Sequence, residues 1–171
     1  FWATHEALLG RVEREHGVPA EYLVAILGVE TTYGSVTGRY RVLDALATLS
    51  FDFPPRAAYF RGELEEFLLL VRREQVDPLG ARGSYAGAMG APQFMPSSIR
   101  RYAVDSDGKG RSDLWSDWHD VFASVANYFV AKGWRAGEPV LAEARAATQG
   151  DDPLAFRLEL DDTLGAIRER G

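Results

Sequence analysis

Apolar residues recur every three or four positions along most of this chain, a spacing typical of amphipathic helices. One predicted helix begins at Pro19 and ends before Gly34, and others are expected at residues 3–15, 41–49, 54–75, 97–102 and 117–132. Gly17 separates the first two helices, because glycine readily ends a helix and proline suits a first helical turn. Helices make up most of the periodic segments, so the fold class expected from this pattern is mainly α.

The pattern changes after residue 137. A break rich in aspartate, glycine and proline at 150–153 precedes a stretch at 155–160 that we interpret as a strand, and a last helix is predicted at 162–168. We therefore expect two parts, a helical domain at 1–137 and a small C-terminal lobe at 138–171. Together they make an α+β chain in which helices dominate.

The helix predicted at 54–75 follows a Pro-Pro pair and is the longest in the chain. Its apolar stripe is expected to consist of Tyr59, Phe60, Leu64, Phe67, Leu68 and Val71. Three acids, Glu63, Glu65 and Glu66, fall between these positions. We interpret them as a solvated flank, since surface helices carry charge opposite their buried face.

Glu30 is the first charged residue after the uncharged stretch 22–29 of the second predicted helix. Leu23, Ile26 and Leu27 share its helical face, and we expect that face to be buried. Removal of water disfavours a carboxylate, and the C-terminal end of a helix dipole acts in the same direction, so a raised pKa is expected for Glu30. A carboxyl group that keeps its proton near neutral pH suits a general acid.

Simpler interpretations of Glu30 stay open at this point. Most glutamates in the last turn of a helix are solvated or paired with a basic residue, and Arg39 or Arg41 could provide such a pair. Position alone therefore does not assign a role to Glu30.

Composition restricts the classes of function. The chain has 171 residues, a formal net charge of −6 and 46% hydrophobic residues, which fits a globular domain with an acidic surface. Such a surface repels phosphate backbones, so we expect no nucleic-acid partner. Cysteine is absent, which excludes disulfides and thiolate chemistry, and the three histidines are too scattered for a metal cluster. No run is long enough to span a membrane, and no export signal is visible in this chain.

The segment GSYAGAMGAPQFMP at residues 83–96 lacks both helical and strand periodicity. Small residues allow a ligand to approach the backbone, while Ser84, Tyr85, Met89 and Gln93 offer polar and apolar contacts. Sugars present hydroxyl groups beside apolar C–H faces, so such a mixture suits a glycan site. A tight loop that only permits close helix packing is the alternative.

Four motifs occur in a fixed order: GVETTYG at 28–34, DALATLSF at 44–51, GSYAGAMGAPQFMP at 83–96 and SVANYF at 124–129. In this combination, from about residue 1 to 137, the chain resembles the MltB/SltB-type lytic murein transglycosylases, glycoside hydrolase family 103. The family's usual chain continues to a further groove segment that is not found here. Two interpretations stay open: a fragment whose C-terminal lobe is truncated, or a variant whose cleft is more open.

The resemblance implies a lysozyme-like catalytic domain that cleaves the β-1,4 bond between N-acetylmuramic acid and N-acetylglucosamine in peptidoglycan. Glu30 takes the position of the family's single catalytic acid, which also serves as the base and leaves a 1,6-anhydro sugar. Ser84 and Gln93 take positions that hold the substrate. Further groove contacts are expected from Tyr59, Met89, Asn127 and Tyr128.

A single acid is consistent with this chemistry. Ordinary glycosidases need two carboxyl groups, whereas an attack from within the substrate needs one, because the substrate supplies the nucleophile. A distant second acid such as Asp44 or Asp52 stays open, although each has a simpler role as a helix cap or turn residue.

Residues 105–113 resemble the start of an EF-hand calcium loop, and the related loops of the family close with an acid that corresponds to Asp120. The expected ligands are Asp105, Asp107, the carbonyl of Arg111 and Asp120. Lys109 takes position five, where an oxygen ligand belongs, and its ammonium group could neutralise the acids instead. We therefore expect weak or absent calcium binding and no required cofactor.

Two other functions remain as alternatives: a muramidase-type hydrolase of the same fold and a non-catalytic peptidoglycan-binding module. The expected partner in each case is a peptidoglycan strand. We expect a monomer that works in the periplasm, the cell envelope or outside the cell, because its substrate lies there.

Overall fold

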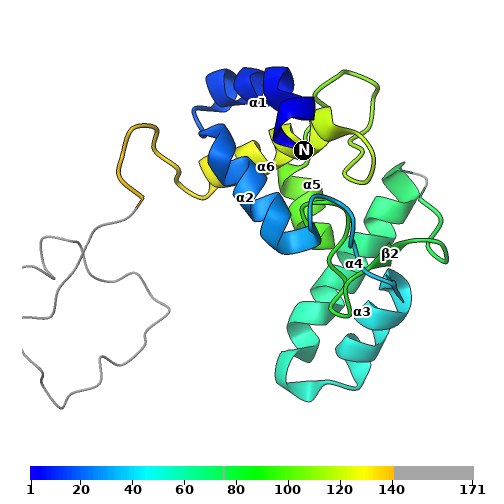
Figure 1. The fold of residues 1–171 in the computed structure, drawn as a ribbon. Helices are drawn as coiled ribbons and strands as arrows, with labels where there is room; N and C mark the ends of the chain where they lie inside the picture. The colour runs from blue at the N-terminus through cyan, green and yellow to red at the C-terminus, as the bar shows by residue number, and fades with distance from the viewer. Residues whose placement is uncertain (75, 141–171) are drawn as a thin grey trace, which may run out of the picture. The chain divides into compact units, whose positions relative to one another are not determined.

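The computed structural model describes residues 1–74 and 76–140, and in this part the chain is mainly helical, as predicted (Figure 1). The helices are α1 (Trp2–His16), α2 (Ala20–Thr31), α3 (Val42–Phe51), α4 (Ala57–Glu74), α5 (Pro96–Tyr102) and α6 (Trp118–Ala131), with a short 3-10 helix, η1 (Pro54–Arg56), before α4. Two short antiparallel strands, β1 (Tyr40–Arg41) and β2 (Arg82–Gly83), pair Tyr40 with Gly83 and Arg41 with Arg82. Phe1–Ala136 forms one compact unit.

The glycine and proline predicted to separate the first two helices lie at their ends. Gly17 ends α1 in the left-handed region, with φ 67°, and its N–H donates to the carbonyl of Glu13. Pro19 is the N-cap of α2. The Pro-Pro pair does not open α4 itself, because it forms the separate turn η1 first.

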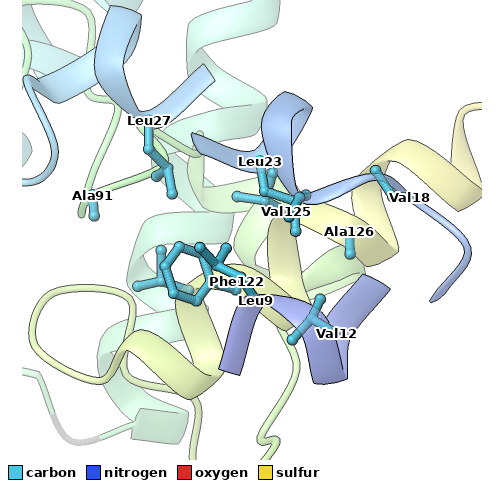
Figure 2. Packing of buried hydrophobic residues seen from close by; sticks show 11 residues of the cluster. Leu9, Val12, Val18, Leu23, Leu27, Ala91, Phe122, Val125 and Ala126 are labelled. Carbon is cyan, nitrogen blue, oxygen red and sulfur yellow. The ribbon is translucent and has the colours of Figure 1, made fainter. Parts of the chain in front are cut away.

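The first hydrophobic cluster is formed by α1, α2 and α6, with the loop residue Ala91 (Figure 2). Leu23 and Leu27 of α2 are fully buried there, as are Val12 of α1 and Phe122 of α6. The expectation that one face of α2 is buried is therefore confirmed for these leucines.

The second cluster lies among α3, α4 and α5 and includes the 83–94 loop. Its buried members include Val42, Leu46, Phe60, Phe67, Met89, Phe94 and Ile99. Met89 has no exposed surface, so the expected groove contact by its side chain is wrong. Soft, unbranched methionine fills irregular gaps in cores, and that is its role here.

The buried face of α4 differs from the predicted stripe. Tyr59 is 42% exposed and Leu68 is 51% exposed, while Glu63 is 5% exposed. Glu63 shares a face with Phe60 and Phe67 and accepts hydrogen bonds from the backbone N–H and the hydroxyl of Ser97. The interpretation of Glu63 as a solvated residue is therefore wrong, because this carboxylate provides an acceptor at the first turn of α5.

The strand predicted at 155–160 and the helix predicted at 162–168 lie outside the described residues. Within the described part, every helix is too short or too polar to cross a bilayer.

Candidate active site

Glu30 is the next-to-last residue of α2, and its side chain is exposed. It forms no salt bridge in the described part of the chain, and Arg41 pairs with Asp44 instead, with 3.3 Å between Nη1 and Oδ2. The expected burial of Glu30 is therefore wrong, and so is the alternative of a pair with Arg41. The carboxyl group stands open to an incoming ligand.

The reason lies in which residue completes the buried face. That face of α2 runs through Ala20, Leu23, Leu27 and Thr31. At about 100° per residue, Thr31 lies about 20° from Ala20 and within this face, whereas Glu30 lies about 20° beyond Leu23, just outside it. The core therefore holds the residue after the acid, and the acid itself projects beside it.

Thr31 fixes the segment that follows Glu30, residues 31–38, which we call the Glu30 turn. Its hydroxyl donates to the carbonyl of Ala91 at 2.8 Å and accepts from the N–H of Gly34 at 3.0 Å. Thr32 and Tyr33 both have positive φ, 49° and 58°. Buried hydrogen bonds of this kind can hold a backbone in sparsely populated conformations, which are concentrated at functional sites. Thr31 was not predicted from the sequence, where its only signal is its spacing of four from Leu27.

Gln93 makes the second link between the Glu30 turn and the 83–94 loop. Its side-chain N–H groups donate to the carbonyls of Thr37 and Gly90, each at 3.0 Å, and its backbone has φ 51°. No hydrogen bond to its amide oxygen occurs in the described residues. Gln93 is thus held in place by its nitrogen and keeps an acceptor free.

The Ser84 side chain forms hydrogen bonds within the 83–94 loop. Its hydroxyl oxygen accepts from the N–H groups of Ala86 and Ala88, at 3.2 and 3.0 Å. The hydroxyl proton is not used by these bonds and remains able to donate. The side chain is half-buried, so Ser84 both shapes the loop and presents a polar group at its surface.

The other predicted contacts lie on helices. Asn127 of α6 donates to the carbonyl of Tyr102 at 3.0 Å, and Tyr128 packs against Tyr102 and Phe94. Tyr59, near the start of α4, lies instead beside Glu63. Burial and the nearby Glu63 carboxylate raise the pKa of Tyr59. The structure therefore joins Gln93 to the Glu30 turn directly, whereas the Ser84 side chain bonds within its own loop. Tyr59 has its contacts within α4 and η1.

The possible second acids have structural roles. Asp44 lies in the first turn of α3 and pairs with Arg41, and Asp52 is the C-cap residue of the same helix. Glu30 is the only acid within residues 28–38 and 83–94.

Three of the predicted calcium ligands come together. Carboxylate oxygens of Asp105, Asp107 and Asp120 lie within 4.8 Å of one another. Asp120 is almost fully buried and accepts from the N–H groups of Ser106 and Asp113, both at 2.8 Å. Burial raises the pKa of Asp120, and these two N–H groups oppose that effect.

Lys109 crosses the same loop. Its ammonium group lies 2.5 Å from Asp107 and 2.7 Å from Asp117, the N-cap residue of α6. The Lys109 hydrogen bond lowers the pKa of Asp107 and, with Asp117, raises the pKa of Lys109. Calcium would therefore have to displace the Lys109 ammonium group from Asp107. For this reason the residues do not fit a complete calcium site.

The sequence of this chain matches a known protein family. The sequence profile of the family described as "Transglycosylase SLT domain" matches residues 1–171. Membrane-bound lytic murein transglycosylase B of Escherichia coli (strain K12) is 55% identical over 150 residues, which cover 88% of this chain and 41% of that protein.

Solved structures agree in fold. Soluble lytic transglycosylase SltB1 from Pseudomonas aeruginosa is 62% identical with a TM-score of 0.79, covering 81% of this chain and 47% of that one. Escherichia coli lytic transglycosylase Slt35, solved in complex with calcium, is 56% identical with a TM-score of 0.78, covering 81% and 44%. The expected lysozyme-like, mainly helical fold is thereby confirmed. This chain spans less than half the length of these relatives.

Proposed function

Because the chain belongs to the transglycosylase SLT domain family, we propose that it is a lytic transglycosylase that cleaves the bond between N-acetylmuramic acid and N-acetylglucosamine in peptidoglycan. The observation that carries the proposal is the attachment of the Glu30 turn to the 83–94 loop through Thr31 and Gln93. This attachment sets one open carboxyl group beside a loop whose free amide oxygen and hydroxyl suit a glycan.

In the proposed reaction Glu30 acts first as an acid. Its proton passes to the glycosidic oxygen while the bond from that oxygen to C1 of the muramic acid breaks. The resulting carboxylate then takes the proton of the C6 hydroxyl of the same sugar, and O6 bonds to C1. The products are a free 4-hydroxyl and a 1,6-anhydro sugar, and no water is consumed. The absence of a second acid from both segments supports this scheme over a two-carboxylate hydrolysis.

Because Glu30 is exposed, we propose that the bound substrate itself removes water from the carboxyl group. A glycan strand bound over the end of α2 displaces water from the carboxyl group, which strengthens the interaction between the proton donor and the glycosidic oxygen. The proton transfer is thereby confined to the bound complex.

Substrate contacts follow from the groups left unused by the fold. We propose that the amide oxygen of Gln93 accepts from a sugar hydroxyl or an N-acetyl N–H, and that the hydroxyl of Ser84 donates to a sugar oxygen. Tyr59, Asn127 and Tyr128 extend the contact surface.

Replacement of Glu30 by Gln tests the acid directly. Because general acid catalysis contributes about 10²- to 10⁴-fold, release of anhydromuropeptides from purified sacculi should fall at least that far. Glu21→Gln, an exposed acid in the first turn of the same helix, serves as the matched control and should keep its activity.

Mass spectrometry of the products separates the candidate functions. Anhydro ends are lighter than hydrolysed ends by one water molecule, so hydrolysed ends would identify a muramidase. Sacculi that are bound but left intact by the wild type would identify a binding module. Undiminished release by Glu30→Gln would remove Glu30 from the acid role.

Cofactor and location complete the proposal. We propose that the reaction needs no cofactor and that Lys109 weakens calcium binding at the 105–113 loop. We propose that the protein works in the periplasm, elsewhere in the cell envelope or outside the cell, because its proposed substrate lies there.

A further inference from the structure

A cavity of about 440 Å³ lies next to the Glu30 turn, between the end of α4, the segment that follows it and residues 111–115. This volume is within the range of sites for small organic ligands. Thr37 lines the cavity, and its carbonyl is the one that accepts from Gln93. The cavity therefore begins where the proposed catalytic segments meet, although Glu30 itself does not line it.

One part of the cavity wall is apolar. Leu70 and Ile99 are 4% and 2% exposed and form a fixed floor, while Val76 and Trp115 complete the wall. Trp115 is 39% exposed, so a large part of its ring can be covered by a ligand. A strongly hydrated inorganic ion gains nothing from such a wall, whereas an organic ligand with an apolar portion does.

Two arginines, Arg82 and Arg111, line the same cavity, and neither forms a salt bridge in the described part of the chain. Arg111 acts on Asp113 only through its charge, where it helps lower the pKa of that acid. A planar guanidinium group matches a carboxylate in a two-pronged geometry. Because neither guanidinium group forms a salt bridge in the described part of the chain, both can bind a carboxylate that enters the cavity.

The acids in the cavity wall are already engaged. Glu74 pairs with Arg73 at 2.7 Å, and Asp77 accepts from the N–H of Leu79 at 2.9 Å. Asp113 accepts from the N–H groups of Trp115 and Ser116 and from the Ser116 hydroxyl. The arginines are therefore the charged groups with the most bonding capacity left for a ligand.

We infer that this cavity binds a carboxylate of the peptide stem that the N-acetylmuramic acid of the substrate carries, with the apolar part of the stem against Trp115. This inference rests on the proposed function and extends it to the substrate's peptide. The stem is attached to the same sugar whose bond is cleaved, and an extended peptide advances about 3.3–3.6 Å per residue. It combines small apolar side chains with free carboxylates, the two features that the wall and the arginines complement.

Peptide binding is tested apart from cleavage. The probe is the stem tripeptide L-Ala-γ-D-Glu-L-Lys with free carboxylates, titrated while the indole N–H signal of Trp115 is followed by NMR. Its amidated form should bind at least roughly tenfold more weakly, because charge-assisted hydrogen bonds are lost. Arg82→Gln and Arg111→Gln should each weaken the free peptide by a similar factor. Arg101→Gln, an exposed arginine of α5 outside the cavity, should bind as the wild type does.

A second measurement places the peptide effect in the reaction. Arg82→Gln should lower kcat/KM on peptide-bearing glycan strands and leave kcat/KM on strands stripped of their peptides unchanged. Arg82→Lys keeps the charge but loses the planar fork, so it should fall between wild type and Arg82→Gln. A thermal melt confirms that each variant is folded.

Equal affinity for the free and amidated peptides, or wild-type binding by both arginine variants, would overturn the inference. Glu30→Gln should still bind the peptide. Peptide binding without any cleavage would therefore count against the proposed function alone, and cleavage without peptide binding would count against the inference alone.

Discussion

Lys109 shows how much one residue changes an otherwise familiar loop. Asp105, Asp107 and Asp120 converge as calcium ligands would, but the ammonium group bonds Asp107 and Asp117. Calcium prefers six to eight oxygen ligands. The loop therefore offers an internal cation where the EF-hand pattern has an oxygen ligand.

Lys109→Asn should convert this loop toward a calcium site, since it removes the competing charge and supplies an oxygen at position five. Isothermal titration calorimetry should show calcium affinity at least about tenfold higher than that of the wild type. Lys132→Asn removes the same charge outside the loop and should leave calcium affinity unchanged. Micromolar calcium uptake by the wild type would show that Lys109 does not block the site.

The residues of the site were predictable to different degrees. Glu30 was found because it ends an uncharged stretch and lies in a family motif, both of which are properties of the sequence. Its exposure was not, because whether Glu30 or Thr31 faces the core depends on how α2 packs against α1 and α6. Glu63 shares the spacing of Phe60 and Phe67, but its burial was not predictable from the sequence, because a charged residue on an apolar helix face is usually solvated.

At the scale of elements, the two-stranded ribbon ties the Glu30 turn to the 83–94 loop. Gly38 precedes β1 with φ 99°, and a Cβ there would lie 2.1 Å from the backbone of Gly83. Two chain segments far apart in sequence can approach this closely only because Gly38 has no side chain.

Gly38→Ala should therefore destabilise the fold by about 3 kcal/mol or more, through both the overlap and the positive φ. Gly62→Ala is the matched control, because its Cβ would meet no atom within 4 Å and it lies inside α4. In a helix interior that change should stabilise by about 0.5–1 kcal/mol. Urea unfolding of both variants measures the difference, and an equal effect at the two sites would contradict the role given to Gly38.

The 83–94 loop also joins the two clusters of the core. Ala91 packs with α1, α2 and α6, whereas Met89 and Phe94 pack with α3, α4 and α5. Met89 and Phe94 hold the loop together by exchanging backbone hydrogen bonds at 2.9 and 3.0 Å. A loop fixed on both sides can present Ser84 and Gln93 in one arrangement, which a binding site requires.

At the scale of the whole molecule, half-buried Asp113 and buried Asp120 should make opposite contributions to the pH dependence of stability. Burial alone would raise the pKa of Asp113, but hydrogen bonds from Ser116 and Trp115 outweigh this effect and lower the pKa below 3.8. Its stabilisation is present above that value and is lost as pH falls through the folded pKa. Burial raises the pKa of Asp120 above 3.8, so its contribution is present below that value and is lost as pH rises through the folded pKa.

Unfolding free energies measured as a function of pH test this difference. Asp113→Asn should flatten the loss of stability on acidification below pH 3.8. Asp120→Asn should remove the loss that accompanies ionisation above pH 3.8, although it lowers stability overall because one backbone N–H loses its acceptor. Slopes that change in the same direction for both variants would contradict the assignment.

The sequence by itself determined the main helices, the glycine and proline between the first two of them, Glu30 as the candidate acid and the family motifs, because these depend on local spacing and residue type. Only the tertiary structure decided that Thr31 and not Glu30 is buried, that Met89 and Glu63 belong to the interior, and that Arg82 and Arg111 share one cavity. The physical reason is that burial and the meeting of distant segments depend on how helix faces pack. A one-residue change in the centre of a face exchanges a core position for a solvent position.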